Sequence, residues 1–109
     1  MVSARDRYLQ RNYSLTEEEW NAVLLLQGGG CAGCGARGVT RSLHTDHDHR
    51  TLATRGILCV HCNSALRKVL DRPEVLEALA AYLRNPPVEQ LFGYRVAVNR
   101  ARKRRRRKR

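Results

Sequence analysis

Apolar residues recur at helical intervals between residues 17 and 27, and both ends of this stretch are marked. Thr16 and Glu19 have the spacing of a capping box, and Leu15 and Trp20 have that of a hydrophobic staple. Three consecutive glycines then stop the pattern. The sequence therefore predicts a helix over residues 17–27. About eleven residues at the start of the chain show no periodicity and are expected to be a loose lead-in.

The middle of the chain reads as a turn followed by two strands. Residues 30–35 contain too much glycine for a helix or a strand and suit a tight turn. Two short, partly β-branched runs, 39–46 and 55–59, flank a polar segment and predict a β-hairpin.

Helical spacing returns at residue 63 and predicts a helix, followed by a second one that begins near Pro73. Asp71 and Glu74 repeat the capping-box spacing there, and the prolines after Asn85 end this helix. Residues 88–98 predict one more short helix, interrupted by a glycine. The apolar faces around Trp20 and on the helix after Pro73 could pack in the core or in a dimer interface. We expect both to pack in the core. The face after Pro73 is formed by Val75, Leu76, Leu79, Ala80 and Leu83.

A chain of 109 residues and 12.5 kDa allows one small domain with appendages. The last ten residues hold 9 of the 21 basic residues and no acid, whereas the other 99 hold 12 basic and 10 acidic residues, a net charge of +2. We expect this tail to be disordered when free and to bind nucleic acid through phosphates. A solubilising tail or a nuclear-localisation signal are the alternatives. The expected contacts are Arg100, Arg102, Lys103, Arg104, Arg105, Arg106, Arg107, Lys108 and Arg109.

Nothing in the sequence predicts membrane insertion or secretion. No apolar stretch approaches the about 20 residues of a transmembrane helix, and the charged N-terminus has no apolar segment behind it, as a signal peptide would. We therefore expect a cytoplasmic protein, in the host cytoplasm if a phage encodes it, in which disulfides do not form.

The four cysteines form two Cys-x-x-Cys pairs separated by 24 residues: Cys31 with Cys34, and Cys59 with Cys62. Two such pairs can place four thiolates around one tetrahedral zinc ion. Four thiolates leave no open coordination position, so the zinc would be structural and would stabilise a small domain. Two disulfides or four buried free thiols are the alternatives, and the expected compartment disfavours the first.

All four histidines lie between Leu43 and Cys62, three of them beside two aspartates: His44, Asp46, His47, Asp48, His49 and, further along, His61. One such histidine would be explained by a solvated polar turn. The cluster instead offers hard oxygen ligands beside imidazoles that exchange protons near neutral pH.

Three segments recur in one known family: Leu15-Thr-x-Glu-Glu with Gln27-Gly-Gly-x-Cys31-x-x-Cys34-Gly, Asp46-His-Asp-His49, and Arg55-Gly-Ile-Leu-Cys59-x-x-Cys62-Asn63. Together, over about residues 15–66, they resemble the recombination endonuclease VII family of phage HNH nucleases. The resemblance implies a treble-clef-like ββα-metal domain that cuts phosphodiester backbones, in branched DNA for the best-known relatives.

Individual roles follow from this resemblance. The four cysteines would bind zinc, Asp46 and Asn63 would bind catalytic Mg²⁺ or Mn²⁺, His47 would be the general base, and His49 would contact the scissile phosphate. Oxygen donors suit Mg²⁺. Adjacent strand residues point to opposite faces, so Asp46 and His47 can act on opposite sides of the phosphate. Zinc binding by Cys62 would fix Asn63 in place.

Two departures from the family pattern matter. The family usually has a Thr-Gly turn after the position of His49, whereas here Thr51 is followed by Leu52 and Ala53. The region after the nuclease segments is also shorter than in the branched-DNA resolvases, whose dimer helices lie there. A homodimer and a junction preference therefore stay open.

The hypothesis is an α+β fold in four parts: a lead-in (1–14), a zinc-bound HNH endonuclease domain (15–71), a helical extension (72–99) and the basic tail (100–109). Its function would be metal-dependent hydrolysis of DNA. The main alternative is a non-catalytic zinc module that binds nucleic acid, and a third is a partner-binding zinc protein, such as a packaging accessory, that retains nuclease remnants. Only Asp46, His47, His49 and Asn63 distinguish these alternatives.

Overall fold

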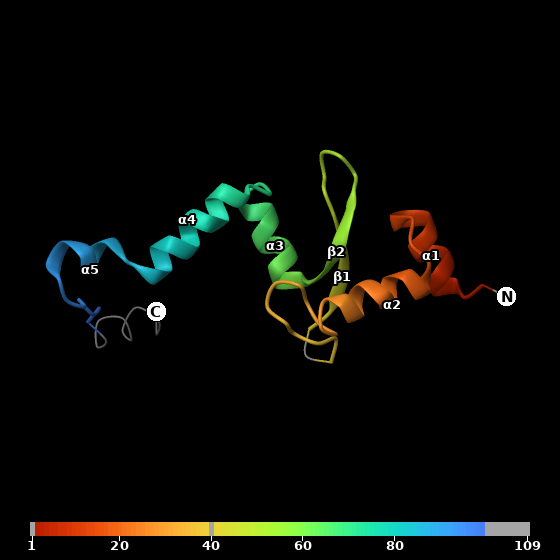
Figure 1. The fold of residues 1–109 in the computed structure, drawn as a ribbon, viewed down its shortest axis with the longest axis horizontal. Helices are drawn as coiled ribbons and strands as arrows, with labels where there is room; N and C mark the ends of the chain where they lie inside the picture. Colours follow the sequence, from red (N-terminus) through yellow and green to blue (C-terminus); the bar gives the residue numbers. More distant parts are fainter. Residues whose placement is uncertain (1, 40, 100–109) are drawn as a thin grey trace, which may run out of the picture. The chain divides into compact units, whose positions relative to one another are not determined.

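The computed structural model describes residues 2–39 and 41–99 (Figure 1). Its contacts divide the chain into two units, residues 1–72 and 73–109, which we describe separately. The first unit contains a two-stranded sheet and three helices: α1 (Ala4–Tyr13), α2 (Glu17–Leu26), β1 (Leu43–His47), β2 (Thr54–Cys59) and α3 (Val60–Lys68). The small α+β domain with a hairpin followed by a helix is as expected.

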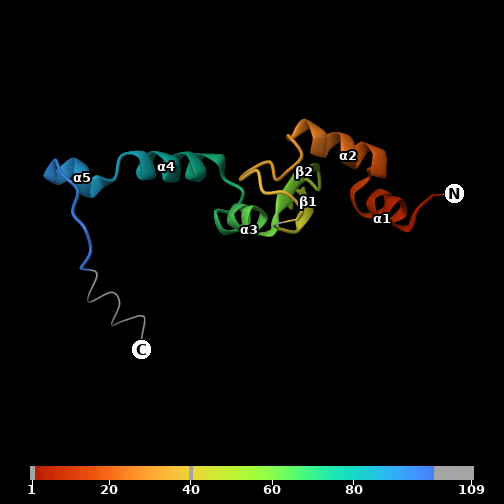
Figure 2. The ribbon, with the colours of Figure 1, turned by 90° about the horizontal axis from the view of Figure 1, so that it is seen from below.

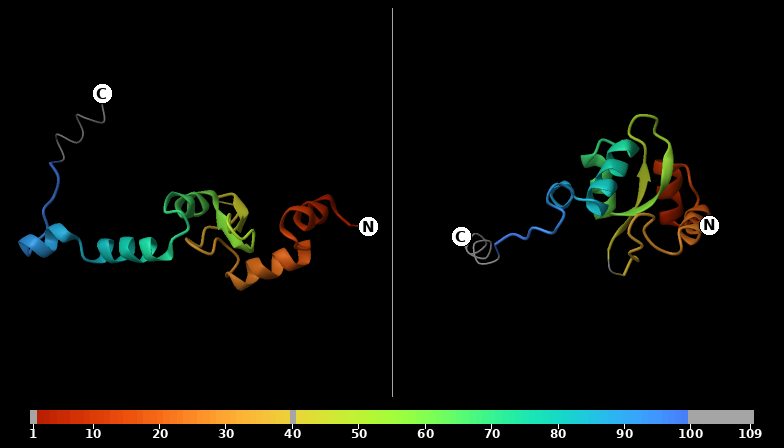
Figure 3. Two further views of the ribbon diagram at one scale, coloured as in Figure 1. Left: turned by 90° about the horizontal axis from the view of Figure 1, so that it is seen from above. Right: turned by 60° about the vertical axis from the view of Figure 1, so that its left-hand side comes forward.

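The second unit begins with α4 (Pro73–Arg84). Within the first unit the hairpin lies between α1 and α2 on one side and α3 on the other (Figure 1). Figure 2 and Figure 3 show the same order from other directions. The hairpin is therefore the central element, and residues of both strands contact helices on either side.

The N-terminal segment is a helix, so the expectation of a loose lead-in is wrong for residues 4–13. Ser3 caps α1 by accepting a hydrogen bond from the backbone N–H of Asp6 at 2.9 Å. Leu9 is 2% exposed and packs with Trp20 and Ile57 in the core. It is the only buried residue of α1, and one buried side chain creates no apolar periodicity for sequence analysis to detect.

The capping box that predicted α2 is present. Thr16 Oγ1 accepts from the backbone N–H of Glu19 at 3.1 Å, and Glu19 Oε1 accepts from that of Thr16 at 2.8 Å. Trp20 is buried as expected, and its indole N–H donates to Thr45 Oγ1 at 2.9 Å. This bond attaches the first turn of α2 to β1.

Gln27, just after α2, binds the sheet through both ends of its side-chain amide. Its Oε1 accepts from the N–H of Ile57 at 2.9 Å, and its Nε2 donates to the Ile57 carbonyl at 2.8 Å. A Cβ at Gly56 would lie 2.9 Å from this Oε1, so the close approach needs glycine. The glutamine therefore pairs with β2 as another strand would.

The hairpin is antiparallel, with Leu43 opposite Cys59 and Asp46 opposite Gly56. His47 then pairs with Thr54, which leaves Arg55 as an additional residue in a β-bulge. β1 begins four residues later than the expected start at residue 39. Bulges frequently adjoin active sites because they redirect a side chain, and this one lies beside the predicted catalytic residues.

α3 begins at Val60, three residues before the expected start, because Cys59 is its N-cap. The Cys59 Sγ accepts a hydrogen bond from the backbone N–H of Cys62 at 3.4 Å. Cysteine is outside the usual set of capping residues, so no helix-start signal is visible in the sequence at this position. The second Cys-x-x-Cys pair thus also forms the first turn of the helix.

The second unit contains α4 (Pro73–Arg84) and α5 (Pro87–Phe92), which ends at Gly93 with φ of 80°. Core packing of the apolar face of α4 was the wrong expectation, because α4 has no buried residue and Leu79 and Leu83 are 47% and 75% exposed. A six-residue α5 offers too little surface to cover that face. Among the described helices, none is long and apolar enough to cross a membrane.

We predict that Leu9→Ala destabilises the first unit by about 2–5 kcal/mol, as expected for a truncated buried leucine. Leu26→Ala is the matched control, because that side chain is 88% exposed. Urea denaturation of the full chain measures both. Equal, small effects of the two substitutions would show that α1 is not part of the core.

Candidate active site and metal centre

The four cysteines converge as their spacing predicted. All four Sγ atoms lie within 4.8 Å of one another, and those of Cys34 and Cys59 are 3.7 Å apart. Zn–S bonds of about 2.3 Å at tetrahedral angles put sulfur atoms about 3.8 Å apart. All four cysteines are free, so the disulfide alternative is wrong. The donor set and its spacing fit one structural zinc ion.

Backbone and side-chain donors surround the sulfur atoms. The N–H of Gly33 lies 3.3 Å from Cys31 Sγ, and Arg41 Nη1 lies 3.6 Å from Cys34 Sγ and 4.0 Å from Cys59 Sγ. Such donors stabilise negative charge on sulfur. They compensate part of the cost of gathering four thiolates.

The thiols differ in how easily they ionise. Burial raises the pKa of Cys31, but backbone donors led by the N–H of Cys59 outweigh it and bring this pKa to about 6. Burial, together with bonds to the neighbouring thiols, raises the pKa of Cys62 to about 12. Zinc binding must therefore displace the Cys62 proton, so zinc affinity falls as the pH falls.

A buried ion pair lies at the centre of the predicted catalytic residues. Asp46 is 4% exposed, and its two carboxylate oxygens accept from Arg55 Nε at 2.7 Å and Nη2 at 3.1 Å. The same Nη2 donates to Asp71 Oδ1 at 3.2 Å, just after α3. The Asp46 carboxylate raises the pKa of Arg55, which stays charged. The bulged arginine therefore joins β1 to the end of α3.

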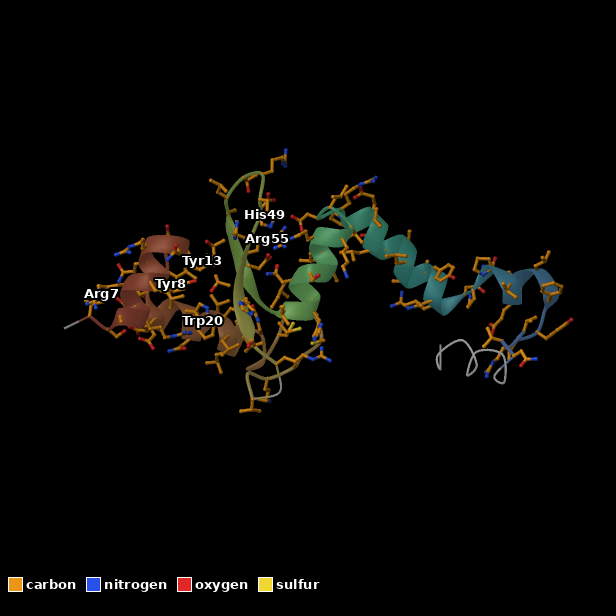
Figure 4. All side chains as sticks on the ribbon, turned by 180° about the vertical axis from the view of Figure 1, so that it is seen from behind. Arg7, Tyr8, Tyr13, Trp20, His49 and Arg55 are labelled. Atoms are coloured by element: carbon orange, nitrogen blue, oxygen red, sulfur yellow. The ribbon has the colours of Figure 1, made fainter. Side chains whose placement is uncertain are left out.

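His47 lies among aromatic rings. Its ring centroid is 4.6 Å from that of His49 and 6.2 Å from that of Tyr13, at the end of α1. Tyr13 in turn contacts Tyr8 edge-on at 6.2 Å. Figure 4 shows Tyr13 beside the hairpin, and His49 and Arg55 on its side nearest α3. The structure thus brings His47 and His49 together, while Asp46 contacts Arg55.

The hairpin loop is held by Asp48. Its Oδ1 accepts from the N–H groups of Thr51 at 3.0 Å and Arg50 at 2.8 Å, which lowers the pKa of this carboxyl. Leu52 has φ of 65°, a left-handed conformation that glycine adopts without strain. The loop therefore closes although Leu52 stands where the family pattern has glycine. Asp48 is a structural hydrogen-bond acceptor.

The other predicted residues are more dispersed. Asn63 is half-buried in α3, directly after Cys62, and among the described residues no hydrogen bond joins it to Asp46.

 Within the described ranges, His44 is exposed on β1 and His61 is exposed in the first turn of α3. The predicted contacts of residues 100–109 lie outside the described part of the chain.

Sequence reasoning missed Arg55 and Tyr13. Arg55 belongs to the Arg-Gly-Ile-Leu-Cys segment. Its role could have been inferred because a buried carboxylate such as that of Asp46 needs a positively charged partner. Tyr13 gave no such signal, because its position depends on α1 packing against the hairpin. The carbonyl of Tyr13 also accepts from Thr54 Oγ1 at 2.9 Å, which fixes the end of α1 to β2.

A family model for recombination endonuclease VII matches residues 6–85, most of the chain. The chain belongs to the recombination endonuclease VII family. The match includes the four cysteines, the hairpin with its Asp46-His-Asp-His49 segment, and α1 from residue 6 onward. The resemblance seen in the sequence is thereby confirmed.

Two relatives come from mycobacteriophages. The chain is 42% identical over 87 residues to the gene 59 protein of Mycobacterium phage D29 and 39% identical over 87 residues to that of Mycobacterium phage L5. Each alignment covers 78% of this chain and 53% of the relative, so the chain spans about half the length of these curated relatives. No solved structure matches this endonuclease VII family member.

We predict about one zinc per purified chain, retained in the folded protein because four thiolates close its coordination sphere. Cys59→Ser removes a ligand and the cap of α3, and should abolish zinc binding and unfold the first unit. His61→Ala, an exposed change between two of the ligands, is the control that keeps zinc. Metal analysis and circular dichroism measure both; fewer than about 0.5 zinc per folded chain would contradict the site.

Proposed function

We propose that this chain is a metal-dependent DNA endonuclease that hydrolyses phosphodiester bonds. The observation that supports this most is the buried Asp46 beside His47 on β1, held by Arg55 within a domain of the endonuclease VII family. A buried carboxylate is costly to fold around, and binding of a catalytic cation gives Asp46 a use beyond its ion pair with Arg55. The family and this costly group together favour an enzyme.

Asp46 and Asn63 would hold the catalytic Mg²⁺ or Mn²⁺. A carboxylate has about four acceptor positions, and Arg55 uses two of them at Asp46, so acceptor capacity is left for a cation. Asn63 follows a zinc ligand and lies in α3, which packs against both strands. A divalent ion bound there would polarise the phosphodiester and stabilise charge on the leaving oxygen.

His47 would act as the general base. It would accept a proton from water as the water oxygen forms a bond to phosphorus and the bond to the leaving oxygen breaks. The His47 ring lies beside Tyr13 at the end of α1, whereas the Asp46 carboxylate is held by Arg55 of β2. His49, beside His47, would donate to the scissile phosphate.

The main alternative is a zinc module that binds nucleic acid without cutting it. The four-cysteine site and the basic tail suit both functions equally.

We also propose that the protein acts in the cytoplasm of an infected host, because two relatives are phage proteins. We further propose that the protein prefers branched DNA, and cleavage of a four-way junction tests this preference.

We predict that the full chain cleaves supercoiled plasmid or a synthetic four-way junction only when Mg²⁺ or Mn²⁺ is present. His47→Ala should lower the rate by about 10²–10⁴, the usual contribution of a general base, and leave DNA affinity nearly unchanged. His44→Ala, at an exposed position of the same strand, is the control. Cleavage by His47→Ala at the parent rate would exclude the mechanism, and no cleavage by the parent of either DNA would favour the binding module.

We predict that deleting residues 100–109, which carry nine of the eleven net positive charges, weakens DNA binding more than catalysis. If the tail neutralises about five phosphates, the slope of log affinity against log salt becomes shallower by about 4–5. The loss should be similar for all sequences, because phosphate contacts carry no base information. A Gly-Ser tail of equal length controls for chain length, and an unchanged slope would show that the tail does not contact DNA.

A further inference from the structure

A cavity of about 360 Å³ opens between the hairpin loop and the end of α3. Its walls are formed by Asp48, His49 and Arg50 from the loop, and by Arg67, Leu70 and Asp71 from the end of α3. All six residues belong to the first unit. The volume is in the lower part of the range of ligand pockets, about 300–1,000 Å³.

Two contacts connect this cavity to the proposed catalytic residues. The ring of His49 lines the cavity and lies 4.6 Å from the ring of His47. Asp71 lines it as well and accepts from Arg55, which holds Asp46. The cavity therefore lies directly beside the residues that we propose to hold the scissile phosphate.

The wall of the cavity carries two arginines and two aspartates. Asp71 is paired with Arg55, and Asp48 accepts backbone N–H groups of its own loop, while the nearby charge of Arg50 helps to lower the pKa of Asp48. In the part of the chain that the structure describes, neither Arg50 nor Arg67 has an ion-pair partner within 4.0 Å. The donor groups of the two guanidinium ions can therefore still bind phosphate oxygens. Guanidinium donors match the geometry of phosphate oxygens.

The end of α3 is strained where it forms the wall. Leu70 and Asp71 have φ of 57° and 55°, a left-handed conformation that is unfavourable for L-amino acids. The N–H of Asp71 nevertheless bonds the Leu66 carbonyl at 2.9 Å, which closes the helix in this form. This way of ending the helix places Asp71 within hydrogen-bond distance of Arg55.

We propose that this cavity is a binding subsite for a backbone phosphate of DNA adjacent to the scissile one, with Arg50 and Arg67 as its ligands. The subsite rests on the proposed nuclease function. It positions the strand beside Asp46 and His47, and it reads no base, because both arginines contact phosphate oxygens only.

Arg67 and Lys68 form a matched pair for the test. Both are exposed basic residues in the last turn of α3, but only Arg67 lines the cavity. Binding of the full chain to duplex DNA is measured against salt in a His47→Ala background, which separates binding from cleavage. Arg67→Ala should lower affinity about tenfold and make the log–log salt slope shallower by about 0.9, the contribution of one phosphate. Lys68→Ala should change both much less.

A modified substrate locates the contact. Replacing a single phosphate next to the cleaved bond with a neutral methylphosphonate should weaken binding by the parent but have no further effect on Arg67→Ala. Arg50→Ala should behave as Arg67→Ala does, and thermal unfolding checks that each variant is folded. Equal losses for Arg67→Ala and Lys68→Ala, or additive losses from the methylphosphonate and Arg67→Ala at every position, would overturn the subsite.

The two proposals fail in different ways. Cleavage of DNA by the parent together with equal effects of Arg67→Ala and Lys68→Ala would overturn the subsite and leave the nuclease. An Arg67-specific loss of affinity in a parent that never cleaves DNA would support the subsite and overturn the nuclease.

Discussion

The convergence of four thiol groups is the constraint on which the rest of this small domain depends. Among the residues that the structure describes, six hydrophobic or cysteine side chains are buried, and two of them belong to the four-cysteine site: Leu9, Trp20, Cys31, Ile57, Leu58 and Cys59. Such a core supplies little hydrophobic stabilisation, whereas structural zinc sites contribute apparent binding free energies of about 10–16 kcal/mol. A zinc ion bound to the four cysteines would therefore supply the folding free energy that a larger apolar core supplies in other domains.

The same constraint extends to the residues that we assign to catalysis. Cys59 ends β2 and caps α3, so the two elements that carry Arg55 and Asn63 meet at a zinc ligand. Gln27 holds the same strand through both backbone groups of Ile57. The bulge then turns Arg55 toward Asp46. A rigid framework of this kind keeps side chains at fixed distances from one another, as a reaction at phosphorus requires.

Sequence patterns predicted the features that depend on local chemistry. The capping box at Thr16 and the cysteine pairs each follow from a few adjacent residues, and the structure confirms both. The glycine expected to interrupt a helix over residues 88–98 instead ends α5. Features that depend on distant contacts were missed or misplaced. The helix around Leu9, the start of β1 and the role of Arg55 are decided by packing and by charge pairing, which no local spacing encodes. The metal-binding and catalytic roles of Asp46 and His47 stay predictions.

All four cysteines and both strands lie before residue 72, in the first of the two units. During synthesis, units of this kind generally fold from the N-terminal side while the rest of the chain is still being made. The last ligand, Cys62, precedes the entire basic segment by more than thirty residues. The ribosome thus completes the metal-binding part of this protein before it adds the cations that would draw the chain to nucleic acid, including the ribosome's own RNA.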